Sequence, residues 1–333
     1  MIIFIYLVSA ESYVNRSCRH VKYFDMKNYK FKILNLILLV LMGWAIPSWS
    51  MTYRDSLGRQ VTLESRPERI IPLAPSLTEI LYYLGLGENV AGVTDYSYYP
   101  SEAKGKPGVG SYIDPNIEKI ISLSPDLVIG TKDGNLPGSV YLLEQVNIPV
   151  YVVNPRNVED AISTIDEIGR LCGVSEKAHK MVVELNKRIE TVRNAVASRE
   201  RPLVFLQINI SPIMTVNRNT FHNDLIDLAG GINMTADEPI TYPRISIEEV
   251  IRKKPDVIII STMGGGEEFE KARDEWMKWP SIPAVKNDQV YLIDSDLIDR
   301  PSQRIIQGLE SIARLIHPEI DWDKSGIVNK LQE

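Results

Sequence analysis

Cysteine is scarce in this 333-residue chain, which contains only Cys18 and Cys172. Cys18 lies in the first 50 residues, which have the features of an export leader, so Cys172 would be the only thiol of the mature protein. A single thiol excludes an intramolecular disulfide, even in a compartment that permits one. No cysteine stands immediately after the leader, so a bacterial lipoprotein anchor has no attachment point.

Histidine and catalytic motifs are also lacking. The four histidines show no spacing typical of metal ligands. The chain has no dinucleotide glycine fingerprint, no G-x-S-x-G elbow and no H-E-x-x-H helix. The glycines at 264–266 lack the Lys and Ser/Thr of a phosphate loop, and we expect a permissive loop there. The sequence therefore favours a protein that is not an enzyme, while an exported enzyme with its active site between two lobes stays open as an alternative.

Positive charge is in short supply, with 37 Lys and Arg against 43 Asp and Glu and a net charge of −6. Residues 1–50 hold six of the basic and two of the acidic residues, which leaves 31 and 41 in the remainder, a net charge of −10. Nucleic-acid binding needs clustered cations, so we expect no nucleic-acid partner. An acidic protein can instead dock on a basic protein surface.

Apolar runs are short, and the most prominent is the 14-residue stretch at 33–46, which three lysines precede. It is too short for a usual membrane span. Its basic flank and the small residues after it predict a secretory signal peptide cut after Ser50, with an uncleaved anchor helix as the alternative. Met26 begins a normal signal peptide, so we expect that residues 1–25 are not translated. The mature protein is expected in the periplasm.

A repeat stands out in what remains. The stretch IEKIISLSPDLVIG at 117–130 returns 130 residues later as IEEVIRKKPDVIII at 247–260. Each copy contains a helix-periodic segment, a Pro-Asp stop and a short apolar run rich in Val and Ile. Proline disfavours the helical state in the residue before it. The apolar run then predicts a strand buried on both faces, as in a parallel sheet under helices.

Alternating strand and helix patterns surround both copies and predict an α/β protein of two Rossmann-like lobes with related wiring. Strands are expected at 69–74, 89–94, 148–153, 202–208 and 289–294. A helix from about 176 to 199 would span roughly 36 Å and would join the lobes as a single long backbone helix. The predicted boundaries are an extension and signal peptide at 1–50, a first lobe with a leading hairpin at 51–156, connecting helices at 157–200, and a second lobe at 201–333.

Five segments together carry a family resemblance that covers about residues 52–318. They are DSLGRQVTL, RIIPLAPSLTEILYYLGLGENVAGVTDYSYYP, VGSYIDPNIEKIISLSPDLVIG, ISIEEVIRKKPDVIII and DRPSQRIIQGLESIARLIHP. The chain resembles the periplasmic substrate-binding proteins of ABC importers for vitamin B12, ferric siderophores and haem, and most of all the cobalamin-binding branch. The resemblance implies a monomer that binds a small molecule between its lobes, with no cofactor or metal of its own.

Candidate ligand-binding residues follow from the loops at the carboxyl ends of the predicted strands, where ligands bind in open α/β folds. Tyr96, Tyr112 and Tyr242 offer flat aromatic faces that suit a macrocycle. Asp296 and Arg300 match positions that line the family's cleft, where they could bind polar groups of a corrin. The cobalamin branch has Trp at some cleft positions where this chain has Tyr112 and Tyr242, so haem or a ferric siderophore stays open as the ligand.

Glu118 and Glu248 occupy the same point of the two repeat copies, in the first turn of the predicted helix. An acidic residue there usually compensates the helix dipole. In the resembling family, glutamates at the matching positions bind arginines on the two permease subunits. The resemblance therefore implies a partner, the permease dimer with its ATPase subunits, and the repeat would suit docking across a two-fold axis.

Overall fold

The computed structural model describes residues 50–262 and 267–322. They belong to a unit that spans Ser50–Glu333. The signal-peptide prediction, Cys18 and the glycine loop at 264–266 lie outside the described residues. Within the described part of the chain, no helix is long and apolar enough to cross a membrane.

The first lobe is built on a parallel sheet that follows an antiparallel hairpin. The hairpin pairs β1 (Met51–Arg54) with β2 (Gln60–Leu63), and the sheet has the order β3 (Ile70–Pro72), β4 (Leu127–Thr131), β5 (Val150–Val153). All residues of these three parallel strands are buried, as expected for a sheet covered on both faces. The helical elements of the lobe are α2 (Pro75–Tyr83), η1 (Gly87–Asn89), η2 (Ser101–Gly105), α3 (Ile117–Ser122) and α4 (Pro137–Gln145).

The strand predicted at 89–94 is wrong. Val90 forms an isolated bridge with Ile70, and Val93 forms another with Gly108. The backbone changes partner between these bridges, because Ala91 N–H donates to the Ile70 carbonyl and Val93 N–H donates to the Pro107 carbonyl. A strand needs several consecutive residues paired with the same neighbour. Residues 89–94 instead pair once with β3 and once with a loop, so they form two isolated bridges.

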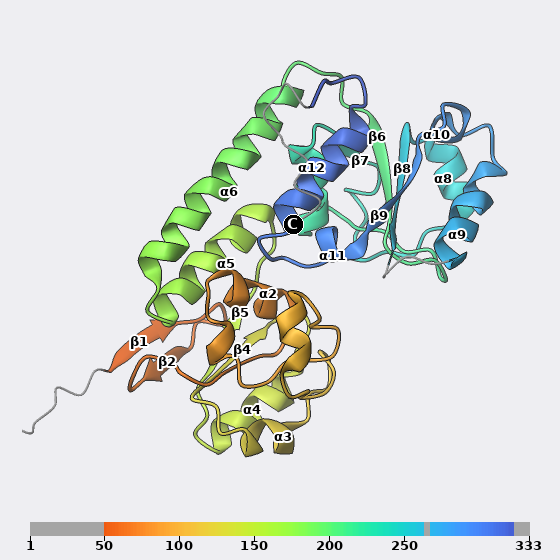
Figure 1. The fold of residues 1–333 in the computed structure, drawn as a ribbon. Coiled ribbons are helices and arrows are strands. Elements are labelled where there is room, and N and C mark those ends of the chain that lie inside the picture. Colours follow the sequence, from red (N-terminus) through yellow and green to blue (C-terminus); the bar gives the residue numbers. More distant parts are fainter. Residues whose placement is uncertain (1–49, 263–266, 323–333) are drawn as a thin grey trace, which may run out of the picture. The chain divides into compact units, whose positions relative to one another are not determined.

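Two helices connect the lobes: α5 (Val158–Leu171) and α6 (Ser175–Val196), the long green helix of Figure 1. The long helix predicted from the sequence is confirmed, although it ends at Val196. It packs against α5, α7 and α12. The approach of α5 to α6 is close at Gly169, where an added Cβ would lie 2.2 Å from the Cβ of Ala178. Cys172, directly after α5, is a free and fully buried thiol.

The second lobe repeats this plan with one additional strand. Its parallel sheet has the order β7 (Ile232–Asn233), β6 (Leu203–Gln207), β8 (Val257–Thr262), β9 (Val290–Asp294). Its helices are α7 (Phe221–Leu228), α8 (Ile247–Lys253), α9 (Glu267–Met277), α10 (Pro283–Lys286), α11 (Ser295–Ile298) and α12 (Ile305–Ile316).

The sequence repeat corresponds to a structural one, in which α3 and β4 match α8 and β8. Both strands lie between two parallel neighbours in their sheets. The turns also match, because Ser124 (φ 47°) and Lys254 (φ 54°) adopt left-handed backbone conformations directly before a Pro-Asp pair. Two lobes with related wiring, as predicted, are therefore present.

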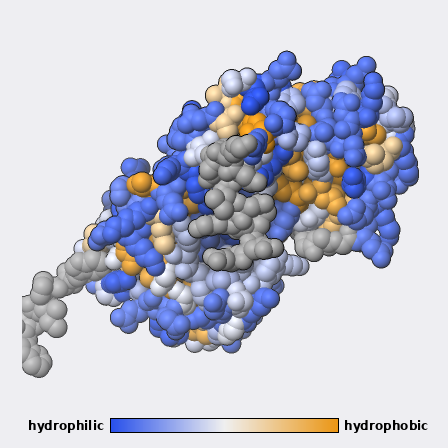
Figure 2. Space-filling model, turned by 45° about the horizontal axis from the view of Figure 1, so that its top comes forward, coloured by the Kyte–Doolittle hydropathy of each residue, from blue (hydrophilic) through white to orange (hydrophobic). Residues whose placement is uncertain are grey.

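The core explains why the repeat strands are apolar throughout. Leu127 and Ile129 of β4 belong to a cluster that continues into α5, α6 and α12, while Val128 packs on the opposite face with Leu143. Successive side chains of a strand point to opposite faces, so both faces need apolar residues. The outer surface differs, since hydrophilic residues dominate the face in Figure 2 and hydrophobic ones gather in a few patches.

The second lobe is tightly packed at Gly308. An added Cβ at this position of α12 would lie 2.3 Å from the carbonyl oxygen of Leu297. Gly308→Ala should therefore lower the free energy of unfolding by about 1 to 3 kcal/mol, the usual effect of overpacking. Urea denaturation is the measurement, and Gly138→Ala in α4 is the control because a Cβ there meets nothing within 4 Å. Equal unfolding midpoints for the two variants would contradict this packing.

Candidate functional site

A cavity of about 710 Å³ lies where the two lobes meet. Its walls include residues from the segments after β3, β5 and β9, together with Thr131 at the end of β4. This agrees with the expectation that ligands bind beyond the carboxyl ends of parallel strands. All five residues predicted to bind ligand line this one cavity: Tyr96, Tyr112, Tyr242, Asp296 and Arg300.

Tyr112 is held by the loop after β4. Its hydroxyl lies 3.1 Å from the hydroxyl of Thr131. The buried amide of Asn135 donates to the Tyr112 carbonyl at 2.7 Å and to the Leu73 carbonyl at 3.0 Å. The ring lies against Gly134, where an added Cβ would come within 1.6 Å of Tyr112 Cζ. Sequence reasoning missed Gly134 and Asn135, although both lie in the loop after the strand of the first repeat copy, at the edge where ligand-binding loops were expected.

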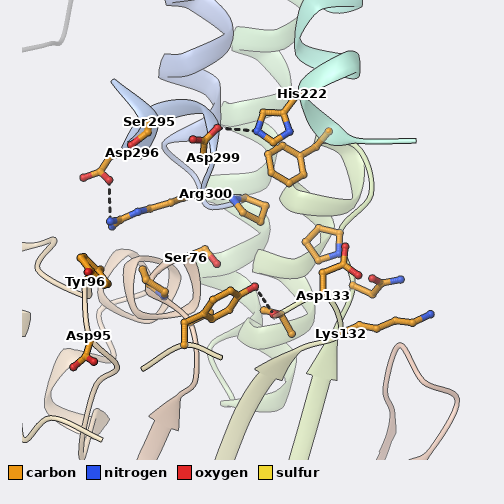
Figure 3. A pocket seen from close by; sticks show the side chains of 18 of the residues that line it. Ser76, Asp95, Tyr96, Lys132, Asp133, His222, Ser295, Asp296, Asp299 and Arg300 are labelled. Atoms are coloured by element: carbon orange, nitrogen blue, oxygen red, sulfur yellow. Dashed lines mark hydrogen bonds and ion pairs between the residues drawn. The ribbon is translucent and has the colours of Figure 1, made fainter. Parts of the chain in front are cut away.

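Tyr96 has an unusual backbone. Its φ is 65°, in the left-handed region that bulky residues rarely adopt, and the residue is 75% exposed. The neighbouring backbone fixes this conformation, because Asp95 N–H donates to Gly110 and Ser97 N–H donates to Thr94. Figure 3 shows Tyr96 on the first-lobe side of the cavity, facing Asp296 and Arg300. Strain of this kind is typical of ligand clamps.

Tyr242 contributes an aromatic ring from the second lobe. The adjoining backbone is anchored by hydrogen bonds from Asn217 N–H to the Thr241 carbonyl and from Thr215 N–H to the Pro243 carbonyl, both 3.0 Å. Burial raises the pKa of the Tyr242 hydroxyl above its ordinary value, and the negative charge of Asp133 in the first lobe raises it further. The hydroxyl is therefore protonated at neutral pH and available as a hydrogen-bond donor.

Asp296 and Arg300 form an ion pair in the cavity wall, with 2.8 Å between Asp296 Oδ1 and Arg300 Nη2 (Figure 3). Asp296 Oδ1 also accepts a hydrogen bond from the Tyr98 hydroxyl at 3.1 Å. The Arg300 guanidinium lies 4.9 Å from the centre of the Tyr98 ring, within the range of a cation–π contact. Tyr98 itself lines the cavity, and these contacts make it a partner of Asp296 and Arg300.

A second polar group in the wall was not foreseen. Asp299 Oδ1 lies 2.8 Å from His222 Nε2, and Asp299 Oδ2 accepts a hydrogen bond from the Ser261 hydroxyl at 2.8 Å. The serine and the histidine both bond to this one carboxylate, whereas in a Ser-His-Asp arrangement the histidine lies between the serine and the acid. Among the described residues, no cluster of His, Cys, Asp or Glu could hold a metal ion.

Charge around the cavity is biased toward acid. Four aspartates and two basic residues line it: Asp95, Asp133, Asp296 and Asp299 with Lys132 and Arg300. Asp133 is neutralised by a bidentate pair with Arg156, at 2.6 and 2.8 Å. The walls thus offer many hydrogen-bond acceptors and few unpaired cations.

Glu118 and Glu248 lie outside the cavity, each as the exposed second residue of its helix. The helix starts match, because the side chains of Asn116 and Ser246 accept hydrogen bonds from the backbone at Lys119 and Glu249. A hydrogen bond from its own backbone N–H lowers the pKa of Glu248, and the Ser246 hydroxyl lowers it further. The predicted structural equivalence of the two glutamates is therefore present, while their docking role stays a prediction.

Comparisons with known proteins agree with this architecture. A sequence model of the periplasmic binding proteins matches residues 70–297. The vitamin B12-binding protein of Vibrio cholerae serotype O1 is 32% identical over 246 residues, 74% of this chain and 87% of that protein. An uncharacterised substrate-binding lipoprotein of a Bacillus subtilis ABC transporter is 32% identical over 277 residues, 81% of this chain and 86% of that protein.

Solved structures extend the comparison to the whole fold. The crystal structure of the periplasmic vitamin B12-binding protein of Vibrio cholerae has a TM-score of 0.68 at 31% identity, covering 79% of this chain and 99% of that one. The apo periplasmic heme-binding protein of Roseiflexus sp. RS-1 has a TM-score of 0.68 at 26% identity, covering 75% and 98%. With its two α/β lobes, its long connecting helix and its cavity at the strand ends, the chain belongs to the periplasmic binding protein family.

Proposed function

We propose that the protein captures a corrinoid in the cavity between its lobes and delivers it to the permease of an ABC importer. The observation that carries this proposal is the single cavity lined by Tyr96, Tyr112, Tyr242, Asp296 and Arg300, which come from both lobes. Aromatic faces on both sides suit a flat macrocycle, and the polar pair suits its substituents. The likeness to vitamin B12-binding proteins supports the same ligand class.

The charge of the cavity supports a corrinoid over haem. The periphery of cobalamin carries neutral amides, whereas haem carries two carboxylates. The four lining aspartates have acceptor lone pairs beyond those that their protein partners use, which suits amide N–H groups, and the guanidinium of Arg300 suits an amide carbonyl. The carboxylates of haem would meet only Lys132 and Arg300 as Lys or Arg residues of the described wall, and Arg300 already pairs with Asp296, which leaves little charge to compensate them in a desolvated site.

Haem or a ferric siderophore is the second candidate, and the tyrosines favour it. A tyrosine oxygen can serve as an iron ligand. Tyr96 is well exposed in the cavity, and the apo heme-binding protein of Roseiflexus sp. RS-1 shares the fold.

The export, oligomeric state and partner predicted from the sequence agree with this binding function. The protein would be exported through a signal peptide cut after Ser50, act as a monomer in the periplasm, and present its ligand to a permease dimer with ATPase subunits. Catalysis is not proposed, because the hydroxyl of Ser261 donates to the Asp299 carboxylate rather than to a histidine that could activate it.

Ligand selectivity is the direct test. Titration calorimetry with cyanocobalamin, cobinamide and haemin should give binding of one corrinoid per protein, with haemin much weaker because of its carboxylates. The absorbance and mass of any ligand retained by the purified protein provide an independent measurement. Binding of haemin alone, with a shifted Soret band, would replace the corrinoid by the second candidate. Formation of a product from any of the three would contradict the binding role.

A further inference from the structure

Glu79 is a buried acid whose partners all lie in the other lobe. It belongs to α2 of the first lobe and is only 1% exposed. Its Oε1 accepts hydrogen bonds from Nη1 of Arg300 at 3.0 Å and from Nη1 of Arg304 at 3.2 Å. Its Oε2 accepts one from the Ser302 hydroxyl at 2.5 Å. Glu79 itself does not line the cavity, whereas Arg300 does.

Aromatic contacts strengthen the same junction. The guanidinium of Arg304 lies 4.2 Å from the centre of the Tyr99 ring, and that of Arg300 lies 4.9 Å from the Tyr98 ring. Both rings belong to the first lobe and both arginines to the second. Two planar cations are therefore fixed between carboxylates and aromatic faces, the surroundings in which guanidinium groups are most ordered.

The charges at this junction balance. Two carboxylates, Glu79 and Asp296, face two guanidiniums, Arg300 and Arg304. Burial raises the pKa of Glu79, while the Ser302 hydrogen bond and the two arginines lower it. The carboxylate depends on these partners for its charge, because a buried carboxylate without a cation is strongly unfavourable.

We propose that Glu79 is a positioning residue for the ligand site, which fixes the Arg300 guanidinium at the cavity wall and ties the two lobes together there. The inference rests on the proposed function, because it assumes that the cavity holds the ligand. Arg300 meets a carboxylate at each of its two terminal nitrogens, Nη1 at Glu79 and Nη2 at Asp296. A donor held in this way loses little freedom when a ligand binds, which favours affinity.

The test is a double-mutant cycle read by calorimetry with cyanocobalamin. Glu79→Gln keeps the shape of the side chain and removes its charge, and we expect binding to weaken about tenfold. In an Arg300→Ala background the same change should have almost no further effect, because Glu79 acts through Arg300. A purely structural role would weaken binding equally in both backgrounds.

Glu310 provides the matched control. It is also a buried residue, 9% exposed, and its carboxylate forms a bidentate pair with Arg188, with distances of 2.8 and 2.7 Å. Neither residue of this pair lines the cavity. Glu310→Gln should lower the melting temperature and leave the affinity unchanged. If Glu79→Gln fails to fold, Ser302→Ala takes its place in the cycle. This variant removes one hydrogen bond to Glu79 Oε2. We expect a smaller loss of affinity, which should also disappear in the Arg300→Ala background.

The outcomes separate this inference from the proposed function. Unchanged affinity in a folded Glu79→Gln variant, or a loss that persists in the Arg300→Ala background, would overturn the positioning role alone. If the wild-type protein binds only haemin, the corrinoid assignment fails and the same cycle, measured with haemin, decides the role of Glu79. If it binds none of the probes, both proposals fall.

Discussion

Replacing Glu118 and Glu248 together by lysine should abolish ligand uptake while ligand binding stays normal. Both glutamates are exposed, lie at the same position of matching helices and stand outside the cavity. Surface changes of this kind normally affect stability little. At the permease, losing one partner of a buried charge pair costs about 2 to 5 kcal/mol, and charge reversal sets like charges together. Uptake by cells and affinity by calorimetry must be measured on the same variants.

Glu176 is the control for this experiment. It is also an exposed first-turn glutamate, on α6, where it pairs with Lys180. Glu176→Lys should leave uptake normal. The alanine single variants should lose part of the uptake and their combination more. Normal uptake in the double variant, or a parallel loss of ligand affinity, would mean that the repeat duplicates a fold without duplicating a task.

Removing the cavity rings should have the largest effect on affinity. We expect Tyr112→Ala and Tyr242→Ala each to weaken corrinoid binding by about 1 to 3 kcal/mol, the scale of a lost aromatic anchor. Tyr112→Phe keeps the ring and gives up only the contact with Thr131, so its affinity should remain close to that of the wild type. The measurement is calorimetry with cyanocobalamin.

Tyr141 separates stacking from a general effect of losing a tyrosine. It lies on α4, is 60% exposed and does not line the cavity, so Tyr141→Ala should bind normally. Unchanged affinity in both Tyr112→Ala and Tyr242→Ala would show that these rings do not stack on the ligand. Tyr96 and Tyr98, which also line the cavity, would then be the next residues to replace.

Local patterns were enough to predict most of the fold. The helix and strand of each repeat copy follow from apolar periodicity and the Pro-Asp stop, which are properties of neighbouring residues. The strand expected at 89–94 failed because a ladder needs a continuous partner, and Val93 bonds to the loop at Pro107 instead. Strand partners are set by tertiary structure, which an apolar run alone does not specify.

The site was predictable only in part, for a related reason. The five ligand-binding candidates came from strand-end loops and from matched family segments, and they line one cavity. Glu79 could not be singled out, because a glutamate in a helix is ordinary and its partners lie more than 220 residues further along the chain. The pair of His222 and Asp299, 77 residues apart, is hidden in the sequence in the same way.

The contact between Gly134 and Tyr112 limits how this binding site can evolve. No side chain fits at 134 while the Tyr112 ring occupies its present place, since even a Cβ would fall 1.6 Å from Cζ. A lineage that changes its ligand by mutation at 134 must first reduce or turn the ring at 112. The reverse order passes through an intermediate with a displaced ring and a damaged site. Descendants of this sequence should therefore show substitutions at 134 only where position 112 has already changed.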